Sequence, residues 1–215
     1  MIVSKWMSKR VVTVDESDTL SEAINTLKRN HVRRLPVLRD NKLVGIVSDR
    51  DLKEAAPSRV TSLDMWELHY LLSKIKVKDL MKRRIITISP DSTIEKAAML
   101  MFDNKIGGLP VVENEELIGI ITEHDVFNAF INITGARIPS FRITVRISDA
   151  PGSIKELCDK MRSFAFKCVS ILTTHVGVEE GHREVIIRFR AEDEEHFKII
   201  EHLEKDYPDL VLSKE

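Results

Sequence analysis

The chain has 215 residues, of which 43% are hydrophobic and 31% charged, a composition typical of ordinary globular proteins. Its formal net charge of −1 excludes a global basic field that would attract nucleic acid or an acidic membrane. Two cysteines are too few for a disulfide framework, and the sequence has neither a signal-peptide pattern nor an apolar run of membrane-helix length, so we expect a cytoplasmic protein.

The N-terminal half contains an internal repeat. A shift of 74 positions, the offset between Met7 and Met81, aligns two stretches of roughly fifty residues without a gap. The identities include Leu-Pro-Val at residues 35–37 and 109–111. A doubled unit of this kind predicts a pseudo-symmetric pair with a cleft at its seam, which favours ligand binding over any particular chemistry.

Each repeat predicts the order strand, helix, strand, strand, helix. Strands are indicated by short β-branched runs, and helices by apolar residues at helical spacing after a capping residue. The proline of each Leu-Pro-Val run favours an edge strand or a strand start. The expected strands are residues 11–14, 35–38 and 43–47 and their copies 85–88, 109–112 and 117–121, and the expected helices follow Asp18 or Thr19, Ser92 or Thr93, Ser48 and Thr122.

Between the copies, residues 61–76 predict an amphipathic connecting helix with one apolar face. Trp66 and Tyr70 fall largely off that face. They are either exposed or packed on a neighbour, and they are our candidates for an intersubunit contact.

A different pattern begins near Pro139. Residues 141–147 alternate between apolar and polar side chains, which indicates a strand with one polar face. The following segments predict a helix around residues 154–161, strands at 169–176 and 184–190, a helix around 197–207 and a strand at 210–212. This βαββαβ order predicts a four-stranded antiparallel sheet covered on one face by two helices.

Residues 45–51 and 119–125 share one pattern: glycine, two apolar residues, Ser or Thr, two variable residues and Asp. This pattern, with the repeat, resembles the adenosyl-binding signature of the CBS-domain family. The resemblance implies a mixed α+β and α/β fold, in which two βαββα CBS domains, residues 1–60 and 77–134, form a pseudo-symmetric pair joined by the helix at 61–76. It also implies an adenine nucleotide, AMP, ADP or ATP, as a regulatory ligand.

Residues 148–154 resemble the first loop and helix start of an ACT domain, a ferredoxin-like regulatory module that often binds amino acids at a dimer interface. The resemblance implies an ACT domain over residues 138–215. The whole order of domains resembles the AcuB type of acetoin-utilisation protein. By the same resemblances we expect a homodimer that regulates an unidentified protein.

The carboxylates of Asp51 and Asp125 are suited to accept hydrogen bonds from a ribose diol. Ser48 and Thr122, each at a helix start, are placed to meet a phosphate. The alternative is that these four residues only close the first turns of two helices. The residues expected to bind the nucleotide are Thr13, Val32, Arg33, Arg34, Pro36, Ser48, Arg50, Asp51, Thr87, Ile106, Gly107, Pro110, Thr122, His124 and Asp125.

The two copies differ in charge. The first has Arg33 and Arg34 before its Leu-Pro-Val run, where the second has Gly107 and Gly108. Guanidinium groups suit phosphate and glycines allow close approach of the backbone, so we expect one site to bind more tightly. The alternative interpretation is that each of these arginines is an ordinary solvated surface residue.

The loop at Asp149, Ala150, Pro151 and Gly152 is the expected site of an amino-acid effector, because free N–H groups at a helix start suit a carboxylate. The competing interpretation is that Asp149 caps the helix and the domain only dimerises. We expect no metal site, since His175 and His182 are too few ligands and consecutive residues at 123–125 do not converge on one ion.

The sequence predicts a regulatory sensor. The alternative is a scaffold whose nucleotide sites are vestigial. A third hypothesis, an enzyme acting on a nucleotide or small acid, lacks any recognisable catalytic motif, so we do not expect an enzyme.

Overall fold

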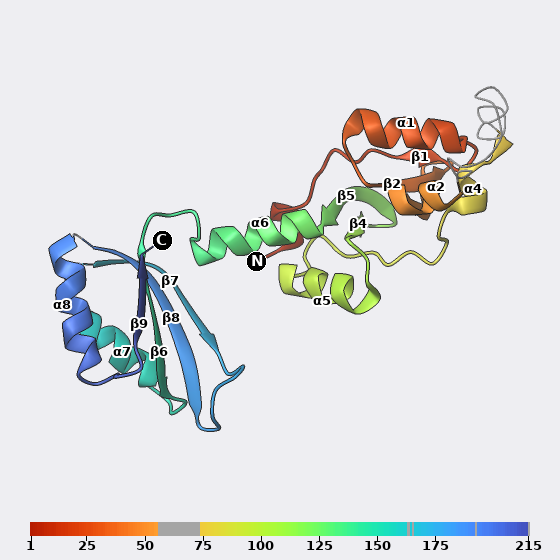
Figure 1. Cartoon of the computed structure of the whole chain (residues 1–215). Coiled ribbons are helices and arrows are strands. Elements are labelled where there is room, and N and C mark those ends of the chain that lie inside the picture. Colours follow the sequence, from red (N-terminus) through yellow and green to blue (C-terminus); the bar gives the residue numbers. More distant parts are fainter. Residues whose placement is uncertain (56–73, 163, 165, 192, 215) are drawn as a thin grey trace. The chain divides into compact units, whose positions relative to one another are not determined.

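The computed structural model describes residues 1–55, 74–162, 164, 166–191 and 193–214 (Figure 1). Contacts divide the chain into two compact units, Met1–Val126 and Phe127–Glu215. The first unit holds the first repeat and the second repeat as far as Val126, in the first turn of its last helix. Most of the predicted connecting helix at residues 61–76, with Trp66 and Tyr70, lies outside the described residues.

The first repeat follows the predicted order of elements. Thr19 starts its first helix with a capping box: the Thr19 hydroxyl accepts from the Glu22 amide, and the Glu22 carboxylate accepts from the Thr19 amide. The following hairpin turns at Asp40 and Asn41, whose positive φ values are those of a tight two-residue turn. Its elements are β1 (Val14–Asp15), α1 (Leu20–Asn30), β2 (Arg34–Arg39), β3 (Lys42–Ser48) and α2 (Asp49–Ala55).

The second repeat has the same architecture, with Thr93 as the N-cap of its first helix and a hairpin turn at Asn114 and Glu115. Here a single parallel bridge between Ile88 and Val111 replaces the first strand. Its elements are α4 (Val77–Leu80), α5 (Ile94–Asn104), β4 (Gly108–Glu113), β5 (Glu116–Thr122) and α6 (Glu123–Thr134), and the short 3-10 helix η1 (Val3–Lys5) lies near the chain start.

The first strands are shorter than the sequence predicts. Only Val14 and Asp15 of the first copy pair with β2, and residues 11–13 leave the sheet. Pro36 lies inside β2 rather than at its start, at a position beyond the two-residue ladder with β1. The missing proline N–H therefore costs no pairing with β1.

The two repeats exchange their leading segments. Residues 3, 4 and 8 hydrogen-bond to the second repeat, at Ser92, Pro90 and Ile120, while Val77, Lys78 and Lys82 bond to the first. The exchange brings Met81 against Gly45, and Met7 against Gly119. Each signature glycine thus makes room for the methionine that precedes the other repeat, which explains why both residues recur at the same offset.

The second unit has the predicted βαββαβ order. Its sheet has the strand order β7-β8-β6-β9, every neighbouring pair is antiparallel, and α7 and α8 pack on one face (Figure 1). This is a ferredoxin-like topology. Its core joins Leu157 and Met161 of α7 and Leu203 of α8 to β6 and β8. The elements are β6 (Phe141–Ser148), α7 (Ser153–Arg162), β7 (Phe166–Thr174), β8 (His182–Ala191), α8 (Asp193–Glu204) and β9 (Val211–Lys214).

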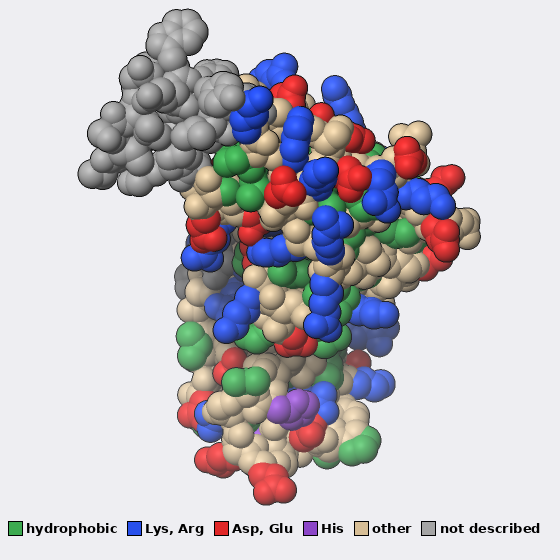
Figure 2. Space-filling view, turned by 90° about the vertical axis from the view of Figure 1, so that its right-hand side faces the viewer, with side chains coloured by type: hydrophobic (Ala, Val, Ile, Leu, Met, Phe, Trp, Pro, Cys, Tyr) green, Lys and Arg blue, Asp and Glu red, His purple; other side chains and the backbone are tan. Residues whose placement is uncertain are grey.

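Basic and acidic side chains are interspersed over the face of the molecule shown in Figure 2. None of the helices in the described ranges is long and apolar enough to cross a membrane. In the same ranges no three His, Cys, Asp or Glu side chains gather as metal ligands would.

Candidate functional site

Two cavities lie at the seam of the repeats. Cavity 1, of about 480 Å³, is lined by Ser8, Arg10, Val12, His31, Val32, Arg33, Arg34, Gly107, Ile120, Thr122, Glu123, His124 and Asp125. Cavity 2, of about 380 Å³, is lined by Arg33, Arg34, Ile46, Ser48, Asp49, Arg50, Asp51, Lys82, Arg84, Ile85, Ile86, Lys105, Ile106, Gly107, Gly108 and Pro110. Both are large enough for a small organic ligand.

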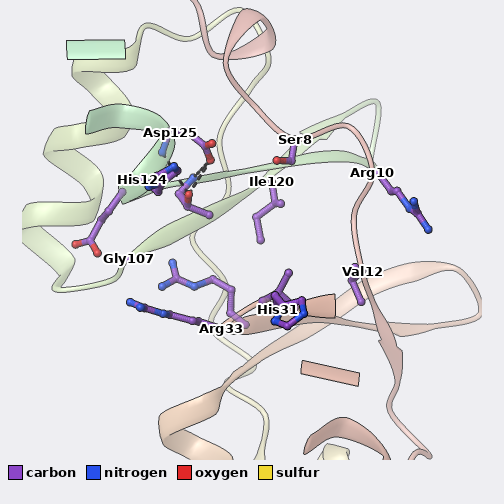
Figure 3. Close-up of a pocket in the computed structure, with 13 residues that line it drawn as sticks. Ser8, Arg10, Val12, His31, Arg33, Gly107, Ile120, His124 and Asp125 are labelled. Atoms are coloured by element: carbon purple, nitrogen blue, oxygen red, sulfur yellow. Dashed lines mark hydrogen bonds between the residues drawn. The ribbon is translucent and has the colours of Figure 1, made fainter. Parts of the chain in front are cut away.

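The two linings are related by the 74-residue repeat, and each draws on both copies. Cavity 1 combines the end of β5 and the start of α6 with residues 8–34 of the first copy, including the backbone after α1. Cavity 2 combines the end of β3 and the start of α2 with residues 82–108 of the second copy. Figure 3 shows Asp125 and Ile120 across cavity 1 from His31 and Arg33, and the side chain of Arg10 turned away from Ile120.

One carboxylate in each cavity belongs to the first turn of a helix. Asp125 Oδ2 accepts from the Thr122 amide at 2.8 Å and from its hydroxyl at 2.7 Å. Asp51 Oδ2 accepts from the Ser48 amide at 2.8 Å and from its hydroxyl at 2.5 Å. These are capping arrangements, and each leaves the Oδ1 atom of the carboxylate outside the cap. The second oxygen is therefore available to another partner.

That second oxygen has different surroundings in the two cavities. In cavity 2, Asp51 Oδ1 lies 2.9 Å from Lys82 Nζ. Burial alone would raise the pKa of Asp51, but hydrogen bonds from Ser48 and Lys82 outweigh it and lower the pKa. In cavity 1, Asp125 makes no ion pair with any residue that the structure describes.

The Arg34 guanidinium lies between the cavities and lines both. It occupies the space above Gly107 and Gly108, where a Cβ atom on Gly107 would come within 2.5 Å of Arg34 Nη2 and 2.7 Å of Glu123 Oε2. Burial lowers the pKa of Arg34, and the nearby Glu123 carboxylate opposes that shift. The glycines of the second copy thus give room to the arginine of the first.

Comparison with known proteins assigns the repeats. The family model of the CBS domain matches residues 3–58 and 77–132. A CBS domain-containing protein of Dictyostelium discoideum is 35% identical over 135 residues, which cover 62% of this chain and 93% of that relative. The chain belongs to the CBS-domain family.

Solved CBS structures resemble the same part of the chain. The CBS domain pair of protein MJ0100, crystallised with 5′-methylthioadenosine and S-adenosyl-L-methionine, is 25% identical with a TM-score of 0.51, covering 64% of this chain and 98% of that one. A Vibrio cholerae protein assigned to acetoin utilization, AcuB, is 30% identical with a TM-score of 0.52 and covers 64% of this chain and 95% of its own. The first unit is therefore a tandem CBS pair with AcuB among its structural neighbours.

Most of the residues expected to bind a nucleotide lie in the linings of the CBS pair's two cavities. Val32, Thr122, His124 and Asp125 line cavity 1, and Ser48, Arg50, Asp51, Ile106 and Pro110 line cavity 2. Arg33, Arg34 and Gly107 line both. Thr13, Pro36 and Thr87 lie outside both linings, and Pro36 is buried in β2.

Each cavity at the seam draws its lining from both CBS copies. Val32 of the first copy shares cavity 1 with Asp125 of the second, and Ile106 of the second copy shares cavity 2 with Asp51 of the first. The linings also include Ser8, Val12, Lys82 and Ile86, which are not among the residues expected to bind the nucleotide, although Lys82 belongs to the basic run at 82–84. The signal for them was the equivalence of their positions at the 74-residue offset, which places Ser8 opposite Lys82 and Val12 opposite Ile86.

In the second unit, the predicted effector loop joins β6 to α7. Asp149 pairs with Arg183, and His175 Nε2 lies 3.2 Å from Asp149 Oδ2. The carboxylate is thus engaged by β8 and the β7–β8 loop. Gly152 has a φ of +95°, and a Cβ atom there would meet nothing within 4 Å, so Gly152 is required by its backbone conformation and not by crowding. Ala150 and Pro151 complete this exposed turn.

Proposed function

We propose that the CBS pair is a regulatory sensor that binds an adenine nucleotide, AMP, ADP or ATP, in the cavities between its repeats. The observation that carries the proposal is the presence, in each cavity, of a capped carboxylate together with the guanidinium groups of Arg33 and Arg34. The adenosine-type ligands in the crystal structure of the MJ0100 pair support it. The proposal assigns no catalytic step to the chain.

The roles follow from the chemistry of each group. The Oδ1 atoms of Asp51 and Asp125 accept from the ribose hydroxyls, because the other oxygen of each carboxylate is held by the helix cap. Arg33 and Arg34 bind phosphate, since a guanidinium offers several donors in a planar fork. The purine lies against apolar side chains, Val12 and Val32 in cavity 1 or Ile86 and Ile106 in cavity 2.

Isothermal titration calorimetry of AMP, ADP and ATP tests this proposal on Asp51→Asn and Asp125→Asn. Asparagine keeps an oxygen for the cap but removes the charge, so folding is retained while a charge-assisted hydrogen bond worth about 1.5–3 kcal/mol is lost. Affinity at the altered cavity should fall about tenfold to a hundredfold. Asp103→Asn, at an exposed position of α5 outside both cavities, is the matched control.

If neither cavity variant weakens any nucleotide, the two aspartates serve only as helix caps. The alternative, a scaffold protein with vestigial sites, holds if the unaltered chain binds none of the three nucleotides. The observation that favours this alternative is that both carboxylates already satisfy helix amides.

For the second unit we propose an ACT-type role in which the ferredoxin-like domain joins two chains and a regulated protein responds to the assembly. Its exposed edge strands support this role, since an edge strand is able to pair with another chain. Binding of an amino-acid effector at residues 149–152 remains a prediction. Such binding requires Asp149 to give up its ion pair with Arg183 and to pair with the ammonium group of the ligand.

A further inference from the structure

The two CBS repeats place different residues at one equivalent position beside the cavities. The Ser8 backbone forms a two-bond antiparallel bridge with Ile120, at 2.9 and 3.0 Å, and the Lys82 backbone forms the same bridge with Ile46, at 2.9 and 3.1 Å. The side chains of Ser8 and Lys82 therefore start from matching points on the walls of cavity 1 and cavity 2. Only cavity 2 receives an ammonium group there.

In cavity 2 the Lys82 ammonium group contacts Asp51 Oδ1, the carboxylate oxygen that takes no part in the helix cap. Lys82 Nζ lies 2.9 Å from Asp51 Oδ1, while Ser48 engages Oδ2. The Lys82 side chain is 67% exposed and that of Asp51 14% exposed. The carboxylate is thus fixed, whereas the lysine reaches it from solvent on a flexible stem that is free to turn elsewhere.

The surroundings of the pair are strongly cationic. Six basic residues line cavity 2, against the two carboxylates Asp49 and Asp51: Arg33, Arg34, Arg50, Lys82, Arg84 and Lys105. In cavity 1 the arginines at positions 10, 33 and 34 face Glu123 and Asp125. Cavity 2 therefore carries the larger excess of positive charge, which favours a more highly charged anion.

We propose that Lys82 makes cavity 2 selective for ligands that carry a polyphosphate, a nucleoside diphosphate or triphosphate, over uncharged nucleosides. The inference rests on the proposed function, because it takes cavity 2 to be a nucleotide site. A ligand that offers only hydroxyl groups has to compete with an ammonium ion for Asp51 Oδ1. A polyphosphate gives that ammonium ion a new anionic partner and releases the oxygen to the ribose.

The test compares ATP, adenosine and inorganic tripolyphosphate by calorimetry on the full chain. Asp125→Asn serves as the background, so that binding at cavity 2 dominates the signal. Lys82→Ser gives cavity 2 the side chain that cavity 1 has at Ser8. It should weaken ATP and tripolyphosphate about tenfold to a hundredfold, the range for loss of one charge-assisted hydrogen bond, and leave adenosine unchanged or tighter.

Two further variants sharpen the comparison. Lys78→Ser removes an exposed lysine outside both cavities, so a similar loss in this variant would mean that overall charge alone drives the effect and would overturn the inference. Ser8→Lys, made with Asp51→Asn as its background, should raise the preference of cavity 1 for ATP over adenosine. An unchanged preference there would also count against Lys82 as the selective group.

The outcomes separate this inference from the proposed function. If Lys82→Ser leaves ATP unchanged, or weakens ATP and adenosine alike, the inference fails while nucleotide binding stands. If the protein binds tripolyphosphate through Lys82 but neither ATP nor adenosine, the proposed function fails and the selectivity for nucleoside polyphosphates fails with it, while Lys82 remains a group that binds polyphosphate. Absence of binding for all three probes overturns both.

Discussion

Burial and hydrogen bonding shift the pKa of the Asp51 carboxylate in opposite directions. Burial raises its pKa, and the bonds from Ser48 and Lys82 lower it below the ordinary value of 3.8. Because the folded-state pKa is the lower one, this carboxylate contributes stability above the unfolded-state pKa and loses that contribution as the pH falls through the folded-state pKa.

Lys82→Ser should therefore raise the pKa of Asp51, because it removes one of the donors that favour the charged form. A carboxyl-detected NMR titration of the variant and of the unaltered chain measures the shift directly. The acid-induced loss of stability that is linked to Asp51 should move to correspondingly higher pH. An Asp51 titration that is the same in both proteins would show that the ion pair does not persist in solution.

At the scale of whole elements, the signature glycines are spacers between the CBS repeats. A Cβ atom on Gly45 would overlap the Met81 side chain, whose Sδ and Cγ atoms lie closest to it. Gly45→Ala should destabilise the first unit by about 1–3 kcal/mol, the usual cost of overpacking a core. Urea denaturation followed by circular dichroism measures this loss.

A double-mutant cycle with Met81→Ala identifies the cause. Met81 is buried, so its truncation alone costs stability by leaving a cavity, but it also creates the room that the added methyl group of Gly45→Ala needs. The double variant should lose less stability than the two single variants added together. If the losses of stability in the two single variants add up in the double variant, the cost of Gly45→Ala does not come from overlap with Met81.

The elements that sequence predicts well are those fixed by local chemistry. The capping box at Thr19 and the tight turn at Asp40 and Asn41 each involve residues close in sequence, so the helix and hairpin around them were predictable. The extent of the first strand was not, because residues 11–13 leave the sheet and Val12 lines a cavity instead. Likewise Asp51 was visible in a local motif, whereas Lys82 reaches it only through the exchange of leading segments between repeats.

At the scale of the whole molecule, α6 carries three exposed apolar side chains. Phe127, Phe130 and Ile133, spaced three residues apart along one side of that helix, are 66%, 59% and 49% exposed. Exposed aromatic stripes of this kind mark contact surfaces between proteins. Together with the open edges of the sheet in the second unit, the stripe favours a homodimer.

Light scattering at micromolar concentration should accordingly give twice the chain mass of 24.6 kDa. Phe130→Asp should shift the equilibrium toward the monomer, because it places a charge at the centre of the surface that we expect a second copy to cover. Val176→Asp is the matched control: Val176 is 86% exposed in the loop between β7 and β8, outside both α6 and the edge strands, and its replacement should leave the mass unchanged. A monomeric mass for the unaltered chain would contradict the dimer. If the chain is a dimer and Phe130→Asp leaves its mass unchanged, the dimer interface does not include this side of α6.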